Sequence, residues 1–510
     1  MQNIIIIDCG SQFTQLIARR LRELKIHSVV LAWDVEPDKI SDLNPNGIII
    51  SGGPDSVNEP DAIKINPEIL KMPCPILGIC YGMQLIAKMS GGQVASNDNH
   101  KEYGVTQIQI KDSAIFQSIP AKINVLMSHG DHVANLPEDF RITASTENNI
   151  TAGFENTSKN FYGLQFHPEV NSTEFGIEIL KNFVFKICLC SGDWDLENFT
   201  ESTIRHIQEI TGGEKIICGL SGGVDSSVAA ALVNKAVGDR LQCVFVDHGL
   251  MRLNEPEDVM NSYKDLGLNV KYVDASELFL KALAGVTEPE KKRHIIGKLF
   301  IDVFDAEANK IQGAKWLLQG TIYPDVIESG MKGKKGAVTI KSHHNVGGLP
   351  EKMNLKLLEP LRDLFKDEVR VIGKIINVPD EIVNRQPFPG PGLAVRCLGE
   401  INEHRLDILR KADFIFREEL QRAGLFKDIW QAFAVLLPVR TVGVMGDSRT
   451  YDEVVALRAV NSKDAMTAEW SRIDLNTLDK ISKRICNEVK GVNRVVVDIT
   501  SKPPATIEWE

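Results

Sequence analysis

The sequence predicts an α/β protein with two doubly wound parallel-sheet domains and a C-terminal α+β domain. At roughly 100–200 residues per domain, the chain of 510 residues is too long for one hydrophobic core and should form two to four domains. Short apolar runs alternate with segments of helical periodicity over most of its length. These runs are rich in β-branched residues, which is typical of strands buried on both faces of a parallel sheet.

Composition and charge are those of an ordinary globular protein. Hydrophobic residues make up 43% of the chain and charged residues 25%, which excludes collagen-like, disordered and coiled-coil proteins. The formal net charge of −10 argues against a general nucleic-acid coat. The sequence shows no secretory signal, no apolar run of about 18 residues and no CxxC pair among its nine cysteines. We therefore expect a cytoplasmic protein with reduced thiols that binds neither nucleic acid nor membrane.

The first predicted domain covers residues 1–190. It begins with Asn3–Asp8, an apolar run that is too short for a typical helix and therefore predicts a buried strand. Apolar residues at helical spacing follow between Phe13 and Leu24. Further strands are expected at 29–31, 47–50 and 76–79, shorter strands between 105 and 164, and a closing helix at about 173–186.

The second predicted domain covers residues 191–385 and begins after the stretch Cys190–Trp194. Lys215–Leu220 is a short apolar run, and a Gly-rich turn separates it from a helical segment at about 224–237. The same alternation recurs afterwards, which predicts a second parallel sheet. The further elements are strands at 241–246, 270–273 and 315–319 and a helix from about 290 to 311.

The run Gln386–Gly392 contains three prolines and marks the start of the third predicted domain, residues 386–510. Proline has no backbone N–H, so this run continues neither a helix nor a central strand. The remaining sequence has α+β character and ends in a strand at 495–499 and a Pro503–Pro504 turn. Gln431 falls in a helical pattern and can be a surface polar residue.

A turn of the form G-x-C-x-G, Gly78–Gly82, lies between a predicted strand and a helix. Such a turn exposes its central side chain above a sheet, and a helix N-terminus favours a thiolate. His167 and Glu169 follow another predicted strand and can supply a base and an orienting group for Cys80. Taken singly, Cys80 can be a small buried hydrophobe and His167 a structural histidine.

The segment Ser51–Pro54 follows the strand predicted at 47–50. Its backbone N–H groups can form an oxyanion hole, although an ordinary turn explains these four residues equally well. Three such motifs rarely coincide by chance at the strand ends of one sheet. Together they indicate nucleophilic catalysis by a thiol.

These motifs resemble those of class I glutamine amidotransferases over about residues 1–190. The resemblance implies that Cys80 attacks the side-chain amide of glutamine, that His167 shuttles the proton and that Glu169 orients His167. Ammonia leaves from a thioester intermediate, which water then hydrolyses. By the same resemblance, the residues that hold the oxyanion or line the glutamine pocket are Gly52, Gly53, Gln84 and Ser128–Asp131.

The loop Ser221–Ser227 lies between a predicted buried strand and a helix. Its backbone N–H groups, its hydroxyls and the helix dipole converge where a phosphate group would bind. No Lys follows its last Gly, so it is not a Walker A loop. Its S-G-G-x-D-S form resembles the loop of ATP pyrophosphatases, which cleave ATP between the α- and β-phosphates; a plain Gly/Ser linker is the alternative. The implied ATP-binding residues are Ser221, Gly222, Gly223, Val224, Asp225, Ser226 and Ser227.

Asp225 and Asp247 are candidate ligands of Mg²⁺ or of the nucleotide. Asp247 follows the strand predicted at 241–246, at the carboxyl edge where open α/β sheets bind ligands. Pyrophosphate has to be neutralised as it leaves, and Mg²⁺ can do so. We therefore expect Mg²⁺ with ATP and no organic prosthetic group. For Asp247, an ordinary strand-end turn is almost as good an interpretation.

Four lysines between Gly330 and Lys341 form a basic stretch punctuated by glycine. Cations and glycines suit a lid over a triphosphate, although a solvated loop is the usual fate of a lysine run. His343 and His344 follow, but no third ligand is close to them in the sequence, so a zinc site is not expected.

Both sites, together with Lys341–Asn345, Pro387–Gly392 and Lys502–Glu510, resemble the glutamine-hydrolysing GMP synthases over essentially the whole chain. The resemblance implies that O2 of xanthosine 5′-monophosphate (XMP) is adenylylated by ATP and that ammonia then displaces AMP to give GMP. It also implies a homodimer formed through the C-terminal domain. The implied lid and ATP–Mg²⁺ residues are Asp325, Glu328, Lys341, His343, His344 and Lys366, and the implied XMP-binding residues are Arg293, Gln431, Lys502, Ile507 and Glu508.

Three other functions share some of these features. Glutamine-dependent NAD synthetase has a glutaminase of another type, which disagrees with Gly78–Gly82. A tRNA-thiolating pyrophosphatase needs a sulfur-carrying cysteine near the loop, but Cys218 and Cys243 fall in predicted buried strands. A sensor that binds glutamine or a nucleotide without turnover would not need the set of Cys80, His167 and Glu169.

Overall fold

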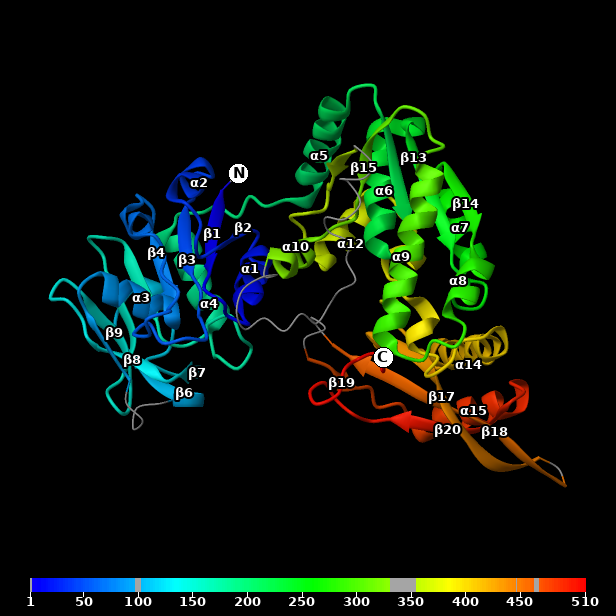
Figure 1. The fold of residues 1–510 in the computed structure, drawn as a ribbon. Helices are drawn as coiled ribbons and strands as arrows, with labels where there is room; N and C mark the ends of the chain where they lie inside the picture. The colour runs from blue at the N-terminus through cyan, green and yellow to red at the C-terminus, as the bar shows by residue number, and fades with distance from the viewer. Residues whose placement is uncertain (1, 97–101, 331–354, 446, 463–466) are drawn as a thin grey trace. The chain divides into compact units, whose positions relative to one another are not determined.

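The protein was analysed as a computed structural model, which describes residues 2–96, 102–330, 355–445, 447–462 and 467–510 (Figure 1). The chain forms two compact units, Met1–Phe199 and Thr200–Glu510. Most of the predicted basic stretch, with Lys341, His343 and His344, lies outside the described residues. None of the described helices combines the length and the apolar character that crossing a membrane requires.

A nine-stranded sheet in the order β2-β1-β3-β4-β11-β10-β9-β6-β7 organises the first unit. The five strands from β2 to β11 are parallel, as predicted, and the other four are antiparallel. The strands are β1 Asn3–Asp8, β2 His27–Ala32, β3 Gly47–Ile50, β4 Ile76–Ile79, β6 Glu102–Ile110, β7 Lys122–His129, β9 Arg141–Thr146, β10 Thr151–Asn156 and β11 Phe161–Leu164, with β5 Gln93–Ser96 and β8 Asp131–Asn135 in a separate two-stranded sheet. The helices are α1 Thr14–Glu23, α2 Pro37–Asp42, α3 Tyr81–Met89 and α4 Gly176–Lys181, which continues as a π-helix over Asn182–Ile187.

Continuous apolar strands explain the parallel half of this sheet. Every residue of β3 and β4 is buried, because other elements cover both faces. Tyr81 and Met83 of α3 pack in the same hydrophobic cluster as Ile50 and Ile76. The core therefore lies directly beneath the turn that joins β4 to α3.

A five-stranded sheet in the order β14-β13-β12-β15-β16 organises the second unit, and all its strands are parallel. This arrangement confirms the second predicted parallel sheet. The strands are β12 Lys215–Leu220, β13 Leu241–Asp247, β14 Val270–Asp274, β15 Ala314–Leu318 and β16 Lys356–Leu358. The helices are α5 Leu196–Thr211, α6 Val224–Val237, α7 Glu255–Asp265, α8 Ser276–Leu283, α9 Pro289–Ala308, α10 Tyr323–Gly330, α12 Lys366–Ile375 and α13 Asp380–Val383.

The C-terminal part has the α+β character that the sequence predicts. Strands β17 and β18 form a long antiparallel hairpin, and β20 pairs with β18 in parallel. The elements are α14 Glu403–Arg422, β17 Gln431–Met445, β18 Ser448–Asn461, β19 Glu469–Trp470, α15 Leu475–Glu488 and β20 Val492–Asp498. The helical pattern around Gln431 is wrong, because Gln431 begins β17 and its side chain is buried. Pairing with β18 outweighs the local periodicity.

The second predicted boundary, near residue 385, falls inside the second unit. One cluster of buried side chains joins Ile217 and Val244 of the parallel sheet to Leu409 and Leu436 of the C-terminal elements. The two parts therefore share a hydrophobic core. The division of the second unit into domains 191–385 and 386–510 stays a prediction.

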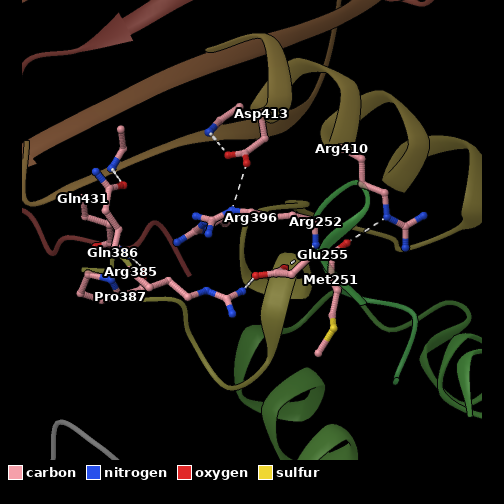
Figure 2. A network of polar contacts seen from close by, with 12 residues as sticks. Met251, Arg252, Glu255, Arg385, Gln386, Pro387, Arg396, Arg410, Asp413 and Gln431 are labelled. Atoms are coloured by element: carbon pink, nitrogen blue, oxygen red, sulfur yellow. Dashed lines mark hydrogen bonds and ion pairs between the residues drawn. The ribbon is translucent and has the colours of Figure 1, made fainter. Parts of the chain in front are cut away.

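A buried ion pair also crosses this boundary (Figure 2). Arg252 Nε lies 3.1 Å from Asp413 Oδ2, and the two side chains are 3% and 1% exposed. Asp413 Oδ1 accepts a hydrogen bond from the Ala434 amide at 3.0 Å. Burial lowers the pKa of Arg252 and the charge of Asp413 opposes this shift. Asp413 thus ties α14 to both the loop after β13 and the strand β17.

We expect Asp413→Asn to lower the free energy of unfolding of the second unit by about 3 kcal/mol. Asn keeps the shape of the side chain and an oxygen for the Ala434 amide, but Arg252 then remains buried without a carboxylate. Urea unfolding curves of parent and variant measure the difference.

The matched control is Asp407→Asn on the same helix. Asp407 pairs with Lys411 at 2.6 Å, but both side chains are about half exposed, so water replaces the lost partner. This variant should leave the urea midpoint unchanged, and an equal effect of the two substitutions would contradict the role of the buried pair.

Candidate functional site

Cys80 occupies a strained turn between β4 and α3. Its φ of 51° and ψ of −106° are unusual for a residue with a side chain. Its amide donates a hydrogen bond to the Leu164 carbonyl of β11 at 2.7 Å, which holds the strained backbone in place. The predicted nucleophile turn is therefore present, with the thiol at the start of α3.

The two glycines of this turn are required by close backbone contacts. A Cβ at Gly78 would lie 2.5 Å from the carbonyl oxygen of Gly82. A Cβ at Gly82 would overlap the carbonyl oxygen of Ile50 in β3. The G-x-C-x-G spacing thus lets α3 start directly above the sheet.

His167 and Glu169 form a buried pair beside this turn. His167 Nδ1 lies 2.7 Å from Glu169 Oε1, and the side chain of Glu169 is fully buried. Burial alone would lower the pKa of His167, but the Glu169 carboxylate and the Cys80 thiol together raise it to about 10. The imidazole is therefore protonated at neutral pH and hydrogen-bonded through its Nδ1.

Further contacts fix the orientation of the imidazole ring. The ring of Phe13 meets His167 edge-on, with centroids 5.1 Å apart. Thr173 Oγ1 donates to the His167 carbonyl at 2.6 Å, and Arg20 Nε donates to the Glu169 carbonyl at 3.0 Å. Both backbone and ring of His167 are consequently held before a substrate binds.

Gly52 and Gly53 lie next to the same catalytic candidates. A Cβ at Gly52 would lie 3.1 Å from Cε1 of His167, and one at Gly53 would lie 2.8 Å from the Cys9 carbonyl oxygen. The turn predicted to bind an oxyanion therefore packs against His167 with no room for side chains.

Gln84, which the sequence predicts to line the glutamine pocket, is buried. Its Nε2 donates to the Asp131 carbonyl at 2.9 Å and lies 3.3 Å from Gln165 Oε1. Gln165 Nε2 in turn lies 3.7 Å from the sulfur of Cys80, and the Ser128 carbonyl is equally far from that sulfur. Gln165 was not among the predicted site residues, although an amide side chain that directly follows an apolar run and precedes His167 by two residues was a usable signal.

The loop Ser221–Ser227 joins β12 to α6. Gly222 has a φ of 74°, a conformation that favours glycine. Ser221 Oγ lies 3.0 Å from Ser226 Oγ and accepts from the Gly223 amide at 3.3 Å. Ser227 is turned inward, where its hydroxyl bonds the Gly223 carbonyl at 2.7 Å. Ser221 and Ser226 are thus the hydroxyls that lie together on this loop.

Asp225 and Lys366, two predicted ATP-site residues, are brought together by α6 and α12. Lys366 Nζ lies 3.3 Å from Asp225 Oδ2. Asp225 Oδ1 is buried and has no hydrogen-bond partner among the described residues. A buried carboxylate oxygen with open lone pairs suits a hard cation such as Mg²⁺.

Two other predicted ATP-site residues make local structural contacts. Asp247 accepts from the Gly249 amide at 2.8 Å and from the Tyr272 hydroxyl at 2.7 Å, so both of its oxygens are used in a strand-end turn. Asp325 Oδ2 accepts from the Ile322 amide at 3.1 Å at the start of α10. The side chain of Glu328 lies outside the described residues.

Glu508, near the C-terminus, is held by two groups. Arg396 donates to both of its carboxylate oxygens, at 2.8 and 3.1 Å, and is itself fully buried. Gln431 Nε2 donates to Glu508 Oε1 at 2.9 Å. Two of the predicted XMP residues, Gln431 and Glu508, therefore meet around Arg396.

Arg293 and its neighbour Lys292 hold the last residue of the chain. Arg293 Nη2 donates to the Glu510 carbonyl at 2.5 Å, and its Nη1 pairs with Glu290 at 2.7 Å. Lys292 is fully buried, and its Nζ lies 2.6 Å from Glu510 Oε2. Arg293 is thus bound to the C-terminal residue of the chain.

Ile507 and Lys502 are positioned mainly through their backbones. Arg458 is fully buried and donates to the Ile507 carbonyl at 3.1 Å. Lys502 exchanges two backbone hydrogen bonds with Ala468, at 2.7 and 3.0 Å. Arg396, Lys292 and Arg458 were missed by the sequence analysis, because their counter-ions lie far away in the chain.

The predicted site residues thus collect into three groups. The Cys80 group belongs to the first unit, and the ATP-loop and Glu508 groups belong to the second. Nowhere in the described part of the chain do three or more His, Cys, Asp or Glu side chains cluster in a way that could hold a metal ion.

Three family models match the chain. The model described as glutamine amidotransferase class-I matches residues 5–187, which include Cys80, His167 and Glu169. The model described as NAD synthase matches residues 196–297, which include the loop Ser221–Ser227. The model described as GMP synthase C terminal domain matches residues 418–509.

Curated relatives match over the full length. A GMP synthase (glutamine-hydrolyzing) of Petrotoga mobilis is 56% identical over 512 residues, which cover 100% of both chains. The proteins of the same name from Aquifex aeolicus and Bacillus cytotoxicus are each 54% identical and cover 99% of this chain and 99% of their own length. Because these relatives are more than half identical and span essentially the whole chain, the chain belongs to the family of glutamine-hydrolysing GMP synthases.

Proposed function

We propose that this chain makes GMP in two coupled steps, with the residues of the Cys80 group as its glutaminase and those of the second unit as its synthetase. Glutamine-dependent GMP synthesis is the activity of the family to which the chain belongs. The observation that carries the division of roles is the strained Cys80 beside the buried His167–Glu169 pair.

In the glutaminase step, the Cys80 sulfur bonds to the side-chain amide carbon of glutamine. His167, which is protonated and holds the proton of the Cys80 thiol, gives this proton to the leaving nitrogen, so that ammonia departs and a thioester remains. Water then attacks the thioester, and glutamate and the free thiol are regenerated. Glu169 stabilises the charged imidazole, and the raised pKa of His167 supports this role. Gly52 and Gly53 would present backbone N–H groups to the oxyanion, and Gln84 supports the pocket from below.

In the synthetase step, O2 of XMP bonds to the α-phosphorus of ATP and pyrophosphate leaves. The N-terminus of α6 and the hydroxyls of Ser221 and Ser226 suit the negative charge that develops on pyrophosphate. Asp225 would hold Mg²⁺ through its free Oδ1, and the ion would neutralise phosphate charge when bound. Lys366, next to Asp225, adds a second positive charge. Ammonia then attacks C2 of the adenylylated nucleotide, and AMP leaves.

For the acceptor nucleotide, we assign XMP binding to the groups around the C-terminus. Glu508, held by Arg396 and Gln431, has the acceptor oxygens that purine N–H groups require. Arg293 and Lys502 have the charge that suits a 5′-phosphate. These roles, and those of Ile507, Asp247, Asp325, Glu328, Lys341, His343 and His344, remain proposals.

We also propose a homodimer formed through the C-terminal domain, in the cytoplasm. The hairpin of β17 and β18 exposes Val442, Val444 and Tyr451, which are at least half exposed in the single chain. Apolar side chains exposed side by side on strands suit burial against a second copy.

Cys80→Ala should abolish glutamine-dependent GMP formation and leave ammonia-dependent formation within about twofold of the parent, because the synthetase residues are unchanged. The rates of GMP formation with glutamine and with ammonium chloride measure this. Cys74→Ala, a buried cysteine of the same unit that is not placed in the site, is the control and should keep both rates. Equal loss of both activities in Cys80→Ala would overturn the two-site assignment.

Glu169→Gln should change the pH dependence of stability. Because the folded-state pKa of His167 lies above its ordinary value of 6.5, protonated His167 stabilises the fold below pH 6.5, and this stabilisation is lost as the pH rises toward about 10. The free energy of unfolding of the parent should therefore exceed that of the variant by the largest amount at pH 6.5, and this difference should shrink toward pH 10. Urea unfolding of the first unit across this range measures it.

Glu174→Gln is the control for this titration. Glu174 accepts from the Asn124 amide at 2.8 Å, and its pKa is lowered by that hydrogen bond, so it stays ionised throughout the range. The stability difference for this variant should be constant from pH 6.5 to 10. A constant difference for Glu169→Gln as well would show that Glu169 does not hold the charge on His167.

Asp225→Asn should slow adenylylation of XMP by about 100-fold, because the amide cannot neutralise or bind a cation as the carboxylate does. With XMP and Mg-ATP but no nitrogen source, rapid-quench experiments on the parent should detect an adenylylated nucleotide. Asp239→Asn, an exposed residue beyond the other end of α6, is the control. A normal rate of pyrophosphate release in Asp225→Asn would remove Asp225 from the site.

A further inference from the structure

The segment Arg385–Phe388 contacts the ATP loop at its first residue. Arg385 follows α13, and its guanidinium donates to the carbonyl of Gly222. The same guanidinium pairs with Glu255 (Figure 2). A Cβ at Gly222 would lie 3.3 Å from Arg385 Nη1, which shows how closely the two groups pack. The backbone carbonyl of Arg385 accepts from Arg370 of α12 at 3.1 Å.

The second residue, Gln386, is bound to the start of β17. Its Nε2 donates to the Ile429 carbonyl at 2.9 Å, and its Oε1 accepts from the Ala432 amide at 3.0 Å. The side chain is buried. The two hydrogen bonds from the Gln386 side chain reach the backbone at the start of β17, an edge strand of its sheet. They fix the segment against the C-terminal sheet.

The third residue, Pro387, shares a hydrogen-bond donor with Glu508. Gln431 Nε2 lies 3.0 Å from the Pro387 carbonyl and 2.9 Å from Glu508 Oε1. One amide group therefore bonds both the segment and the proposed acceptor site. A ligand bound at the Glu508 carboxylate would thus lie one amide group away from Pro387, which is two residues from Arg385.

The fourth residue, Phe388, lies between two guanidinium groups. Its ring centroid is 4.5 Å from Arg252 and 5.1 Å from Arg396. Arg396 holds Glu508, and the amide of Arg252 donates to Glu255, the partner of Arg385, at 2.8 Å. A second chain of contacts thus joins the ATP loop to Glu508.

We propose that Arg385–Phe388 positions the ATP loop relative to the acceptor nucleotide, and that Arg385 is the positioning residue through which a purine nucleotide monophosphate bound at Glu508 strengthens Mg-ATP binding. This inference rests on the proposed function of the two sites in the second unit. Its physical basis is that the Arg385 fork bonds Gly222 and Glu255 at once, so the carbonyl of the loop follows any movement of the segment.

The test measures the coupling between the two ligands by calorimetry. The probes are α,β-methylene-ATP with Mg²⁺, which cannot release pyrophosphate, and XMP. In the parent, saturating XMP should lower the Kd of the ATP analogue by about fivefold or more, and the analogue should lower the Kd of XMP by the same factor. In Arg385→Lys, which keeps the charge but has no fork to bridge both partners, this factor should fall below about twofold.

Arg405→Lys is the matched control. Arg405 also bonds backbone carbonyls and a carboxylate, those of Leu398, Glu400 and Glu453, but none of these belongs to the ATP loop or to the Glu508 group. It should keep the full coupling factor even if its melting temperature falls. Phe388→Leu, which removes the ring from the second chain of contacts, is a further variant and should also weaken the coupling.

Two results would overturn the proposal. One is that XMP leaves the affinity of the parent for the ATP analogue unchanged, and the other is that Arg385→Lys and Phe388→Leu both retain the parent's coupling factor. Failure of the proposed function is distinguishable, since the parent would then release no pyrophosphate from ATP in the presence of XMP. A loss of stability alone lowers the fraction of folded protein but does not alter the ratio of the two dissociation constants.

Discussion

Strands buried on both faces of a parallel sheet offer side chains to a ligand only where they end, and both units carry their candidate site residues in the turns at these ends. β4 ends at Cys80 and β12 ends at the loop Ser221–Ser227, and in each case a helix begins immediately. The dipole of each helix therefore points its positive end at the turn. The proposed thiol chemistry and the proposed phosphoryl transfer both develop negative charge, so the same structural arrangement suits both steps of the proposed function.

In the first unit, burial and charge oppose each other at His167. The side chain is almost inaccessible to water, which on its own disfavours the imidazolium, yet Glu169 and Cys80 raise the pKa of the ring to about 10. Contacts from Phe13 and Thr173 keep the ring in place. The His167–Glu169 pair is therefore oriented and charged without a ligand, which would reduce the reorganisation that the proposed glutaminase step requires.

In the second unit, three fully buried cationic side chains bind the C-terminal residues. Arg396 is paired with Glu508, Lys292 with Glu510, and Arg458 with carbonyls of the last turn. A buried charge is tolerated only when it is paired and hydrogen-bonded, so the C-terminal residues are counter-ions of the core as well as candidates for substrate binding.

The sequence by itself predicted the parallel sheets and the two strand–turn–helix motifs, because periodicity and glycine spacing report on contacts within a few residues. It also marked Cys80, His167 and Glu169 as candidates by residue type and by their positions after predicted strands, and folding brings the three together. Tertiary structure alone decided the rest. Gln431 became a strand residue through pairing with β18, Asp247 was closed into a turn by Tyr272, and Arg396 found its counter-ion more than one hundred residues away. Burial and ion pairing are set by segments that meet only on folding, and no local pattern in the chain encodes them.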